Sequence, residues 1–254
     1  MSSSPAILDP VVIPLIQGPR ILDVGCGLGK WGYLCLTNYW ETYGAQQGTI
    51  PEITGIDAFL PNVMRLREQN VYREVLHALC PPLPFGDQTF NTVLLIEVIE
   101  HLEKNAAFHL ISEAQRVAQH RVVLSTPNFP SFRPGHETLT GFNPLEAHVS
   151  YWERRTLKKF GFKLYGAGLK QGHRQWRRIL YRLGLLHFYD CQFRRPLGNL
   201  SYWFPSIAEN VVGVWIKDSA LHLSPPSREE LASCSNPSGR HLFHRPSPTA
   251  RIQE

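Results

Sequence analysis

RILDVGCGLGKWG, residues 20–32, is the stretch of sequence that decides the fold. The apolar residues at positions 21, 22 and 24 are typical of a short buried strand. Glycines at positions 25, 27 and 29 follow, and they lack the Cβ atoms that would hold a ligand away from the backbone. A helix expected over residues 30–39 would point its N-terminal amides at the same space, which favours an anionic group such as a carboxylate. The stretch therefore predicts a ligand site at the end of a strand.

Two classes of ligand use such a turn, and a turn without a ligand is the third option. Residues 27–32 fit the G-x-G-x-x-G of a dinucleotide site, where the pyrophosphate lies at the helix N-terminus. Asp23 favours the other class, because a carboxylate just before the first glycine repels a pyrophosphate and attracts the ammonium of an amino-acid group. The pattern Asp-x-Gly-x-Gly-x-Gly resembles the S-adenosylmethionine loop of class I methyltransferases.

The resemblance implies S-adenosylmethionine as the cofactor and assigns its contacts. Asp23 would face the ammonium directly or through water, the glycines would line the methionine and ribose, and Glu97 would contribute its backbone. Asp57, at the end of a strand expected over residues 52–57, would accept the ribose hydroxyls; the alternative role is a helix N-cap. The implied cofactor-binding residues are Asp23, Gly25, Cys26, Gly27, Gly29, Asp57, Leu79, Cys80 and Glu97.

The adenine side of this predicted site departs from the family. Similar methyltransferases carry a strand-end Asp four residues before a Leu-Pro-Phe turn, and that Asp receives the adenine amino group. Here the turn is residues 83–85 and the matching position is Leu79. Adenine would then depend on backbone groups around Leu79 and Cys80 and on apolar contact. The loss of one hydrogen bond costs roughly 0.5–1.5 kcal/mol, which weakens binding without abolishing it.

Later segments continue the resemblance as far as about residue 168. Residues 90–96 form an almost uninterrupted apolar run, typical of a central parallel strand. The sequence Glu-Val-Ile-Glu-His-Leu at 97–102 and Ser-Thr-Pro-Asn at 125–128 both look like the family. The fold class implied is α/β, a Rossmann-like seven-stranded mixed sheet with helices on both faces. Strands are expected at residues 20–24, 52–57, 74–77, 90–96, 121–128, 162–166 and 210–216, and helices at 30–39, 63–73, 106–119 and 151–160.

The predicted organisation is one catalytic core with additions. It divides into an N-terminal cover segment (1–19), a methyltransferase core (20–168), a basic aromatic insertion (169–208), the last strand of the core (209–221) and a tail of low order (222–254). Residues 129–150 are rich in Pro, Gly, Phe and His and longer than an ordinary connection, so we expect them to form a lid over the site.

Four residues are candidates for the chemistry. Glu97, Glu100 and His101 have the i, i+3, i+4 spacing of one helical face, and His148 would return from the lid. The Glu-x-x-Glu-His sequence resembles the metal-binding segment of small-RNA end methyltransferases and of ubiquinone-pathway O-methyltransferases, which implies a divalent metal on these four residues. Without metal, His101 or His148, with Glu100, would supply a general base. The structural alternative is that Glu97 contributes backbone only and the other two begin a helix.

The charge of the chain is unevenly distributed. The formal net charge is +5. Most of the positive excess lies in residues 151–195. This segment is interpreted as a solvated face, a membrane-surface helix around 171–187 or an RNA contact. Aromatic and basic residues of the lid and insertion favour a small-molecule, glycan or lipid-linked acceptor over a protein. The residues are Phe129, Phe132, Arg133, Phe142, Trp152 and Trp176.

The predicted function is methyl transfer from S-adenosylmethionine to an O, N or C nucleophile of such an acceptor. Three alternatives stay open: an RNA-end methyltransferase with a divalent metal, a non-catalytic cofactor-binding module, and an NAD-binding oxidoreductase. The first residues lack a basic n-region and no long apolar run is present, so we expect a cytoplasmic protein with optional peripheral membrane contact. Five cysteines without a C-x-x-C spacing predict reduced thiols.

Overall fold

The structure is a computed structural model that describes residues 4–43, 50–169, 182–185 and 195–217. Contacts divide the chain into two units, residues 1–222 and 223–254, and the second unit lies wholly outside the described residues. The tail expected over residues 222–254 therefore lies outside the description. So does most of the basic helix expected in the insertion, Trp176 included.

A seven-stranded sheet forms the centre of the first unit, in the order β3-β2-β1-β4-β5-β9-β8. The first five strands pair in parallel, whereas β9 is antiparallel to both β5 and β8. This order confirms the mixed sheet expected from the sequence. The strands are β1 (Arg20–Val24), β2 (Glu52–Asp57), β3 (Glu74–His77), β4 (Phe90–Ile96), β5 (Ala118–Pro127), β8 (Lys163–Leu169) and β9 (Ala208–Ile216).

The strand order creates a switch point between β1 and β4. From β1 the chain builds outward through β2 and β3, and it then crosses back to place β4 on the other side of β1. Ligands of open α/β sheets bind in the crevice at the carboxyl ends of the strands at such a point. All seven residues of β4 are buried, as expected for a central strand covered on both faces.

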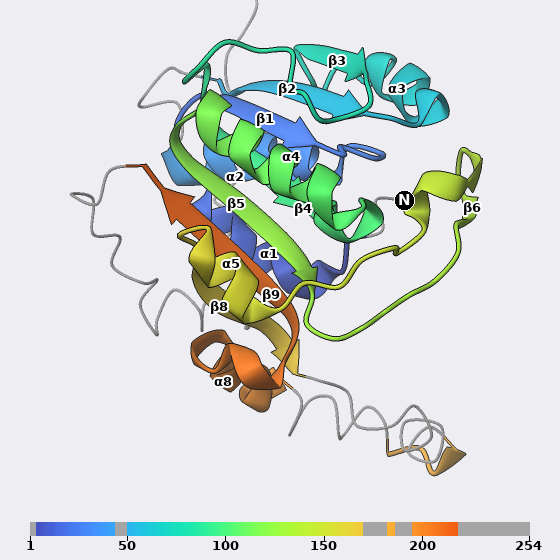
Figure 1. Ribbon diagram of the computed structural model, residues 1–254, viewed down its shortest axis with the longest axis vertical. Coiled ribbons are helices and arrows are strands. Elements are labelled where there is room, and N and C mark those ends of the chain that lie inside the picture. Colours follow the sequence, from blue (N-terminus) through green and yellow to red (C-terminus); the bar gives the residue numbers. More distant parts are fainter. Residues whose placement is uncertain (1–3, 44–49, 170–181, 186–194, 218–254) are drawn as a thin grey trace, which may run out of the picture. The chain divides into compact units, whose positions relative to one another are not determined.

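Helices cover both faces of the sheet (Figure 1). One hydrophobic core lies under α1, α2 and α3, and the other lies under α4 and α5. The helices are α1 (Asp9–Val12), α2 (Lys30–Tyr43), α3 (Leu60–Arg67), α4 (Lys104–Val117), α5 (Arg154–Lys159) and α8 (Arg195–Trp203), with short 3-10 turns η1 (Ala6–Leu8), η2 (Ile13–Leu15), η3 (Ile99–His101), η4 (Pro144–Glu146) and η6 (Pro205–Ile207). No helix among the described residues is long and apolar enough to span a bilayer.

The expected boundaries of the helix after β2 were wrong. α3 begins at Leu60 and ends at Arg67, instead of spanning residues 63–73. It starts early because Pro61 fits the first turn of a helix, and the left-handed Asn70, with φ 52°, does not permit it to continue. Val71 and Tyr72 then turn into the core, where Tyr72 is 8% exposed. This turn brings the Tyr72 hydroxyl under the glycine loop.

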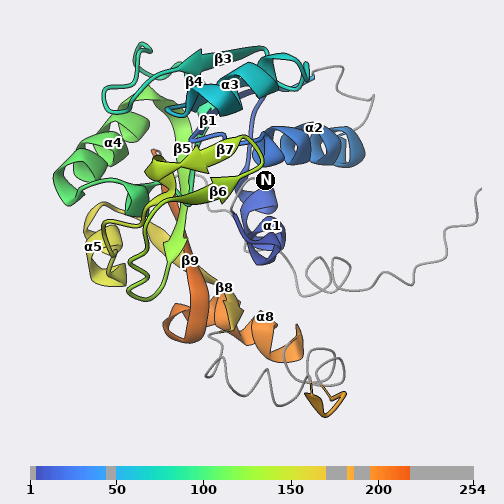
Figure 2. The same cartoon turned by 90° about the vertical axis from the view of Figure 1, so that its right-hand side faces the viewer.

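The lid contains regular structure that the sequence did not indicate. A two-stranded hairpin, β6 (His136–Thr138) and β7 (Gly141–Asn143), lies on the side of the carboxyl ends of the central strands (Figures 1 and 2). The Thr140 hydroxyl at the hairpin turn donates to Asn62 Oδ1 of α3 over 2.7 Å. The lid is thus tied to the β2 side of the switch point.

Candidate functional site

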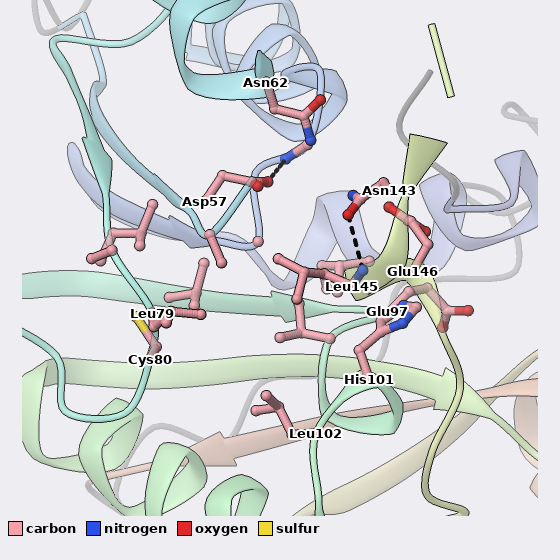
Figure 3. Close-up of a pocket in the computed structure, with 18 of the residues that line it drawn as sticks. Asp57, Asn62, Leu79, Cys80, Glu97, His101, Leu102, Asn143, Leu145 and Glu146 are labelled. Atoms are coloured by element: carbon pink, nitrogen blue, oxygen red, sulfur yellow. Dashed lines mark hydrogen bonds between the residues drawn. The ribbon is translucent and has the colours of Figure 1, made fainter. Parts of the chain in front are cut away.

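A pocket opens at the switch point, between the carboxyl ends of β1, β2 and β4 and the lid (Figure 3). In this view Leu79 and Cys80 lie at one end, Glu97 and His101 lie at the other, and Asp57 lies between them. Its lining comes from the glycine loop, the strand ends and the lid: Val24, Gly25, Gly27, Leu28, Ile56, Asp57, Ala58, Asn62, Ala78, Leu79, Cys80, Ile96, Glu97, Val98, His101, Leu102, Leu110, Thr138, Asn143, Leu145 and Glu146.

The glycine loop forms one wall of the pocket. Gly25 and Gly27 have positive φ angles of 70° and 56°, which residues other than glycine rarely adopt. The Gly25 amide donates to the Ile56 carbonyl over 2.7 Å, so the loop is held against β2. A Cβ at Gly25 would stand 2.8 Å from Val98 Cγ2. The loop therefore presents bare backbone to the pocket, as a ligand cradle requires.

Asp57 lies where the ribose prediction places it, at the end of β2 and on the pocket wall. Its carboxylate accepts the amides of Gly27 and Phe59, each over 2.8 Å. Burial raises the pKa of this carboxyl, and the two amide donors act in the opposite direction. The Phe59 contact also makes Asp57 a cap for the turn before α3. The Asn62 side chain is a third hydrogen-bond partner of this carboxylate. An ionised carboxylate has about four acceptor positions, so one remains for a ribose hydroxyl.

Asp23 does not belong to the pocket lining, so the structure does not support the direct contact with the cofactor ammonium, and the contact through water stays a prediction. Asp23 is 1% exposed and accepts the Tyr72 hydroxyl over 2.6 Å, and that hydroxyl in turn accepts the Gly32 amide over 3.1 Å. Burial raises the pKa of Asp23 to about 7 despite the Tyr72 hydrogen bond, and the charge of Asp57 contributes further. Asp23 thus supports the glycine loop through the Tyr72 hydroxyl instead of contacting the pocket.

Two other predicted contacts of the loop also point away from the pocket. Cys26 is buried, and its pKa is raised well above the usual range by burial and then by the charge of Asp23. Gly29 is not a pocket residue; a Cβ there would stand 2.6 Å from Leu66 in α3. Both residues serve packing, because Cys26 belongs to the hydrophobic core and Gly29 lies against Leu66 and Tyr72.

Leu79 and Cys80 form the far end of the pocket, on the side predicted for adenine. Leu79 is 75% exposed, although leucine is an apolar residue. Burial raises the pKa of Cys80 to about 11, so its thiol stays protonated near neutral pH. Together they give this end an apolar wall without a carboxylate.

Glu97 ends β4 in the left-handed conformation, with φ 57°. This geometry contradicts the expectation that Glu97, Glu100 and His101 share one helical face, because the helical turn η3 begins only at Ile99. Glu97 belongs to the pocket lining, and its carboxylate accepts the Ser125 hydroxyl over 2.7 Å and the Asn210 amide over 3.0 Å. Burial raises the pKa of Glu97 to about 7, and the hydrogen bonds from Ser125 and Asn210 oppose the rise.

Glu100, His101 and His148 do converge, with one potential ligand atom of each within 4.8 Å of the others. The ring centroids of the two histidines are 4.8 Å apart and nearly perpendicular. His101 Nδ1 lies 3.0 Å from the Ala147 carbonyl, and the amides of Val149 and Ser150 donate to the Glu100 carbonyl. The lid is therefore fastened directly onto η3 at this cluster.

The protonation of the cluster follows from its burial. Glu100 is 1% exposed, and neither carboxylate oxygen has a well-formed hydrogen bond within the described part of the chain. Burial and then the charge of Glu97 raise its pKa well above the usual range. Burial lowers the pKa of His101, and burial followed by the charge of Arg133 lowers that of His148 to about 4. Both imidazoles are thus neutral near pH 7.

The donor types in this cluster fit a divalent metal. Two neutral imidazoles and one carboxylate are a common ligand set for such ions, and coordination would add a partner to the buried Glu100 carboxylate, which among the described residues has only a weak contact with Thr126. The Ala147 carbonyl at His101 Nδ1 is the kind of outer partner that orients a ligating histidine. Glu97 stands apart from this set, because Ser125 and Asn210 occupy its carboxylate.

The aromatic residues proposed for the acceptor divide into two groups. Phe129, Phe132 and Phe142 of the lid are between 40% and 66% exposed and available for contact. Trp152 is 1% exposed, and its indole donates to the Ile99 carbonyl and the Ser150 hydroxyl. Its assignment to the acceptor was wrong; it supports η3 from beneath.

Sequence reasoning missed residues that only the tertiary structure brings to the site. Asn62 and Glu146 line the pocket, and Tyr72, Ser125 and Asn210 hold the carboxylates of Asp23 and Glu97. Glu146 offered one signal, since it is one of only two acidic residues in a lid rich in aromatic and histidine residues. The others carry polar side chains of ordinary composition with no motif.

The parallel sheet closed by the antiparallel β9, with a glycine loop between β1 and α2, defines a class I, Rossmann-like methyltransferase domain. A family model described as "Methyltransferase domain" matches residues 7–166. The chain belongs to this family, and S-adenosylmethionine is the cofactor that this membership implies.

Proteins similar to this chain are described as S-adenosylmethionine-dependent methyltransferases. A probable S-adenosylmethionine-dependent methyltransferase of Mycolicibacterium smegmatis is 29% identical over 61% of this chain and 58% of its own length. Another, from Mycobacterium tuberculosis, is 25% identical over 81% of this chain and 70% of its own length. A solved S-adenosylmethionine-dependent methyltransferase of Archaeoglobus fulgidus is 18% identical, with a TM-score of 0.48, over 82% of this chain and 90% of that chain. The chain thus spans little more than half of the M. smegmatis relative.

Proposed function

We propose that the protein transfers a methyl group from S-adenosylmethionine to a nucleophile, foremost a hydroxyl, of a small-molecule, glycan or lipid-linked acceptor. The observation that carries this proposal is the cluster of Glu100, His101 and His148, which lies between the pocket and the lid and joins the two. When bound, the cofactor supplies the methyl group as an electrophile. The chain's own part is to hold the cofactor, orient the acceptor and take up a proton.

Each end of the pocket has a distinct task in this proposal. Gly25 and Gly27 admit the amino-acid part of the cofactor, Asp57 accepts a ribose hydroxyl, and Leu79 and Cys80 contact adenine. The acceptor enters from the lid side, where exposed phenylalanines give it an apolar surface. Much of the rate of a methyl displacement comes from holding the nucleophile in line.

Proton removal is the task of the cluster. His101 lines the pocket and is neutral near pH 7, because burial lowers its pKa. A neutral imidazole can accept the proton of an acceptor hydroxyl as the new O–C bond forms. His148 lies edge-on to His101 and outside the pocket lining, where it supports the ring.

A metal-assisted route is the second candidate, favoured by the buried Glu100 carboxylate, which has no well-formed hydrogen bond among the described residues. Glu100, His101 and His148 would hold a divalent ion, and that ion would acidify the acceptor hydroxyl. The acceptor could then be a small molecule or the terminal hydroxyl of an RNA. Both routes use the same residues, so an experiment on metal dependence separates them.

Equilibrium binding and a label-transfer screen test the proposal. We expect the protein to bind S-adenosylmethionine, and to move its radiolabelled methyl group into a component of native metabolite or lipid extracts. Binding of NAD in place of S-adenosylmethionine would favour the oxidoreductase. Binding without any transfer would favour a non-catalytic module, and label entering RNA alone would overturn the small-acceptor assignment.

Metal dependence is measured once an acceptor is found. Activity abolished by a chelator and restored by Mg²⁺ or Mn²⁺ supports coordination by the cluster. Chelator-resistant activity supports the base, and its acid limb should then fall below the ordinary histidine range, because burial lowers the pKa of His101. The base must be unprotonated, so activity is lost as the pH falls through that value.

A further inference from the structure

Acidic residues outnumber basic ones in the lining of the pocket. Asp57, Glu97 and Glu146 belong to it, whereas no Lys or Arg does within the residues that the structure describes. The positive charge of Arg133 acts on Glu97 and His101 from outside this lining. His101 adds no positive charge near pH 7, because burial lowers its pKa. Such a pocket favours a cationic ligand over a neutral one of the same shape.

Glu146 differs from the other two carboxylates in its surroundings. Asp57 and Glu97 accept hydrogen bonds from the protein, as described above. Glu146 Oε2 is inaccessible to solvent and has no hydrogen-bond partner among the described residues. A buried carboxylate oxygen without a partner is costly, and a bound cation would offset the cost.

The backbone fixes Glu146 over the pocket. It ends the turn η4, where Asn143 Oδ1 accepts the Leu145 amide over 3.0 Å and the Pro144 carbonyl accepts the Ala147 amide over 3.3 Å. Figure 3 shows Glu146 at the same end of the pocket as Glu97 and His101, beyond Asp57. The carboxylate is therefore carried by the lid and not by the sheet.

The position of Glu146 matches one part of the cofactor. Burial is the main cause of the shifted pKa values of Asp57 and His101, and the negative charge of Glu146 acts on both groups. In the proposed function the ribose lies at Asp57, and the acceptor is deprotonated near His101. The sulfur that carries the methyl group must lie between these two residues.

We propose that Glu146 is the counter-charge of the cofactor sulfonium and makes the pocket select S-adenosylmethionine over S-adenosylhomocysteine. This inference rests on the proposed function. The sulfonium carries one positive charge, and transfer of the methyl group leaves a neutral thioether on the product. The attraction of Glu146 is therefore present before the reaction and absent after it, so the used cofactor is held less tightly by the lid.

Calorimetric binding of three ligands to the full chain tests this assignment. The ligands are S-adenosylmethionine, S-adenosylhomocysteine and sinefungin, in which an amine-bearing carbon replaces the methyl sulfonium and restores a positive charge. In Glu146→Gln we expect affinity for both cationic ligands to fall about tenfold, the order of one partly screened charge pair. Affinity for S-adenosylhomocysteine should change by less than about twofold on the same reasoning.

Two variants serve as matched controls. Glu137→Gln removes the same charge from an exposed position in the β6–β7 hairpin of the same lid and should leave all three affinities unchanged. Glu146→Asp keeps the charge and should keep most of the preference for the cationic ligands. An equal loss for all three ligands in Glu146→Gln, or no loss for any, overturns the inference. If the unaltered protein binds none of the three, the proposed function itself fails.

Discussion

The two sides of the pocket are built in different ways. The sheet half, which carries Gly25, Gly27 and Asp57, is held by backbone hydrogen bonds between parallel strands and by amides that converge on one carboxylate. The lid half, residues 129–150, is held by a few contacts, among them Thr140 to Asn62 and Ala147 to His101. The sheet half, built from strand ends and backbone amides, suits the cofactor. The lid half, carried by a long loop, suits the acceptor, because loops are where a fold places its variable binding contacts.

The largest expected effect is a loss of cofactor affinity when the glycine loop of the sheet half is disrupted. In Gly25→Val a Cβ would stand 2.8 Å from Val98 Cγ2, in a backbone conformation with φ 70°. We expect S-adenosylmethionine binding to fall by at least about 100-fold, because the cradle must move and costs of a few kcal/mol are typical of such strain. Calorimetry measures the affinity, and circular dichroism checks that the variant folds.

A glycine in the lid half provides the control for backbone strain alone. Gly141 also has a positive φ, 108°, yet a Cβ added there meets nothing within 4 Å. Gly141→Ala should therefore change cofactor affinity by less than about threefold. A loss in Gly141→Ala as large as in Gly25→Val would show that the lid holds the cofactor as firmly as the sheet does.

The second effect separates acceptor chemistry from cofactor binding. His148→Ala removes a lid residue that lies against His101 and outside the pocket lining. We expect kcat to fall about 100-fold, within the range for loss of general base function or its support, with cofactor affinity changed far less. Steady-state kinetics and calorimetry on the same preparation give both numbers.

His109, exposed on α4, supplies the matched substitution for this test. His109→Ala should leave both kcat and affinity unchanged. Unchanged turnover in both His101→Ala and His148→Ala would remove the cluster from the mechanism, whether it acts as a base or as a metal site.

The difference between the halves also explains what could be predicted from sequence. The run at residues 90–96 has the composition of a buried parallel strand, and β4 has these bounds. Asp57 was found because a strand pattern ends there. Local pattern suffices for the strands of the sheet half and for Asp57, since these positions follow from strand periodicity.

The features of the site that could not be predicted depend on contacts between residues far apart in the sequence. Tyr72 reaches Asp23 from 49 positions away, and Asn210 reaches Glu97 from 113 positions away, with no local pattern to indicate either pair. The single left-handed residue Glu97 removes its side chain from the helical face that the spacing predicted. Lid residues such as Glu146 acquire a role only when the loop folds back over the sheet.

A third prediction tests how Asp23 supports the sheet half. Burial raises its pKa to about 7 in the folded protein, so the native state binds this proton more tightly than the unfolded chain does. Its contribution to stability is therefore greatest at low pH and is lost as the pH rises from about 4 to about 7. In Asp23→Asn this loss should disappear.

Urea unfolding at pH 5 and pH 8 measures the effect. Between these two values the unaltered protein should lose roughly 3 kcal/mol more stability than Asp23→Asn, since about two pKa units lie inside the window and each is worth about 1.4 kcal/mol. Other buried groups, Glu97 among them, titrate in both proteins and cancel in the comparison. Parallel changes in the two proteins would mean that Asp23 titrates normally.

The smallest expected effect is a gain of cofactor affinity at Leu79, where the sheet half departs from the family. Leu79 is 75% exposed and lines the end of the pocket assigned to adenine, so a polar side chain fits there without disturbing the core. Leu79→Asp would offer the adenine amino group a hydrogen-bond acceptor, worth about 0.5–1.5 kcal/mol, which raises affinity for S-adenosylmethionine about two- to tenfold. Leu79→Ala, which removes the apolar contact without adding an acceptor, is the reference, and calorimetry compares the two. Equal affinities would mean that adenine does not reach this wall, and its place in the pocket would have to be reassigned.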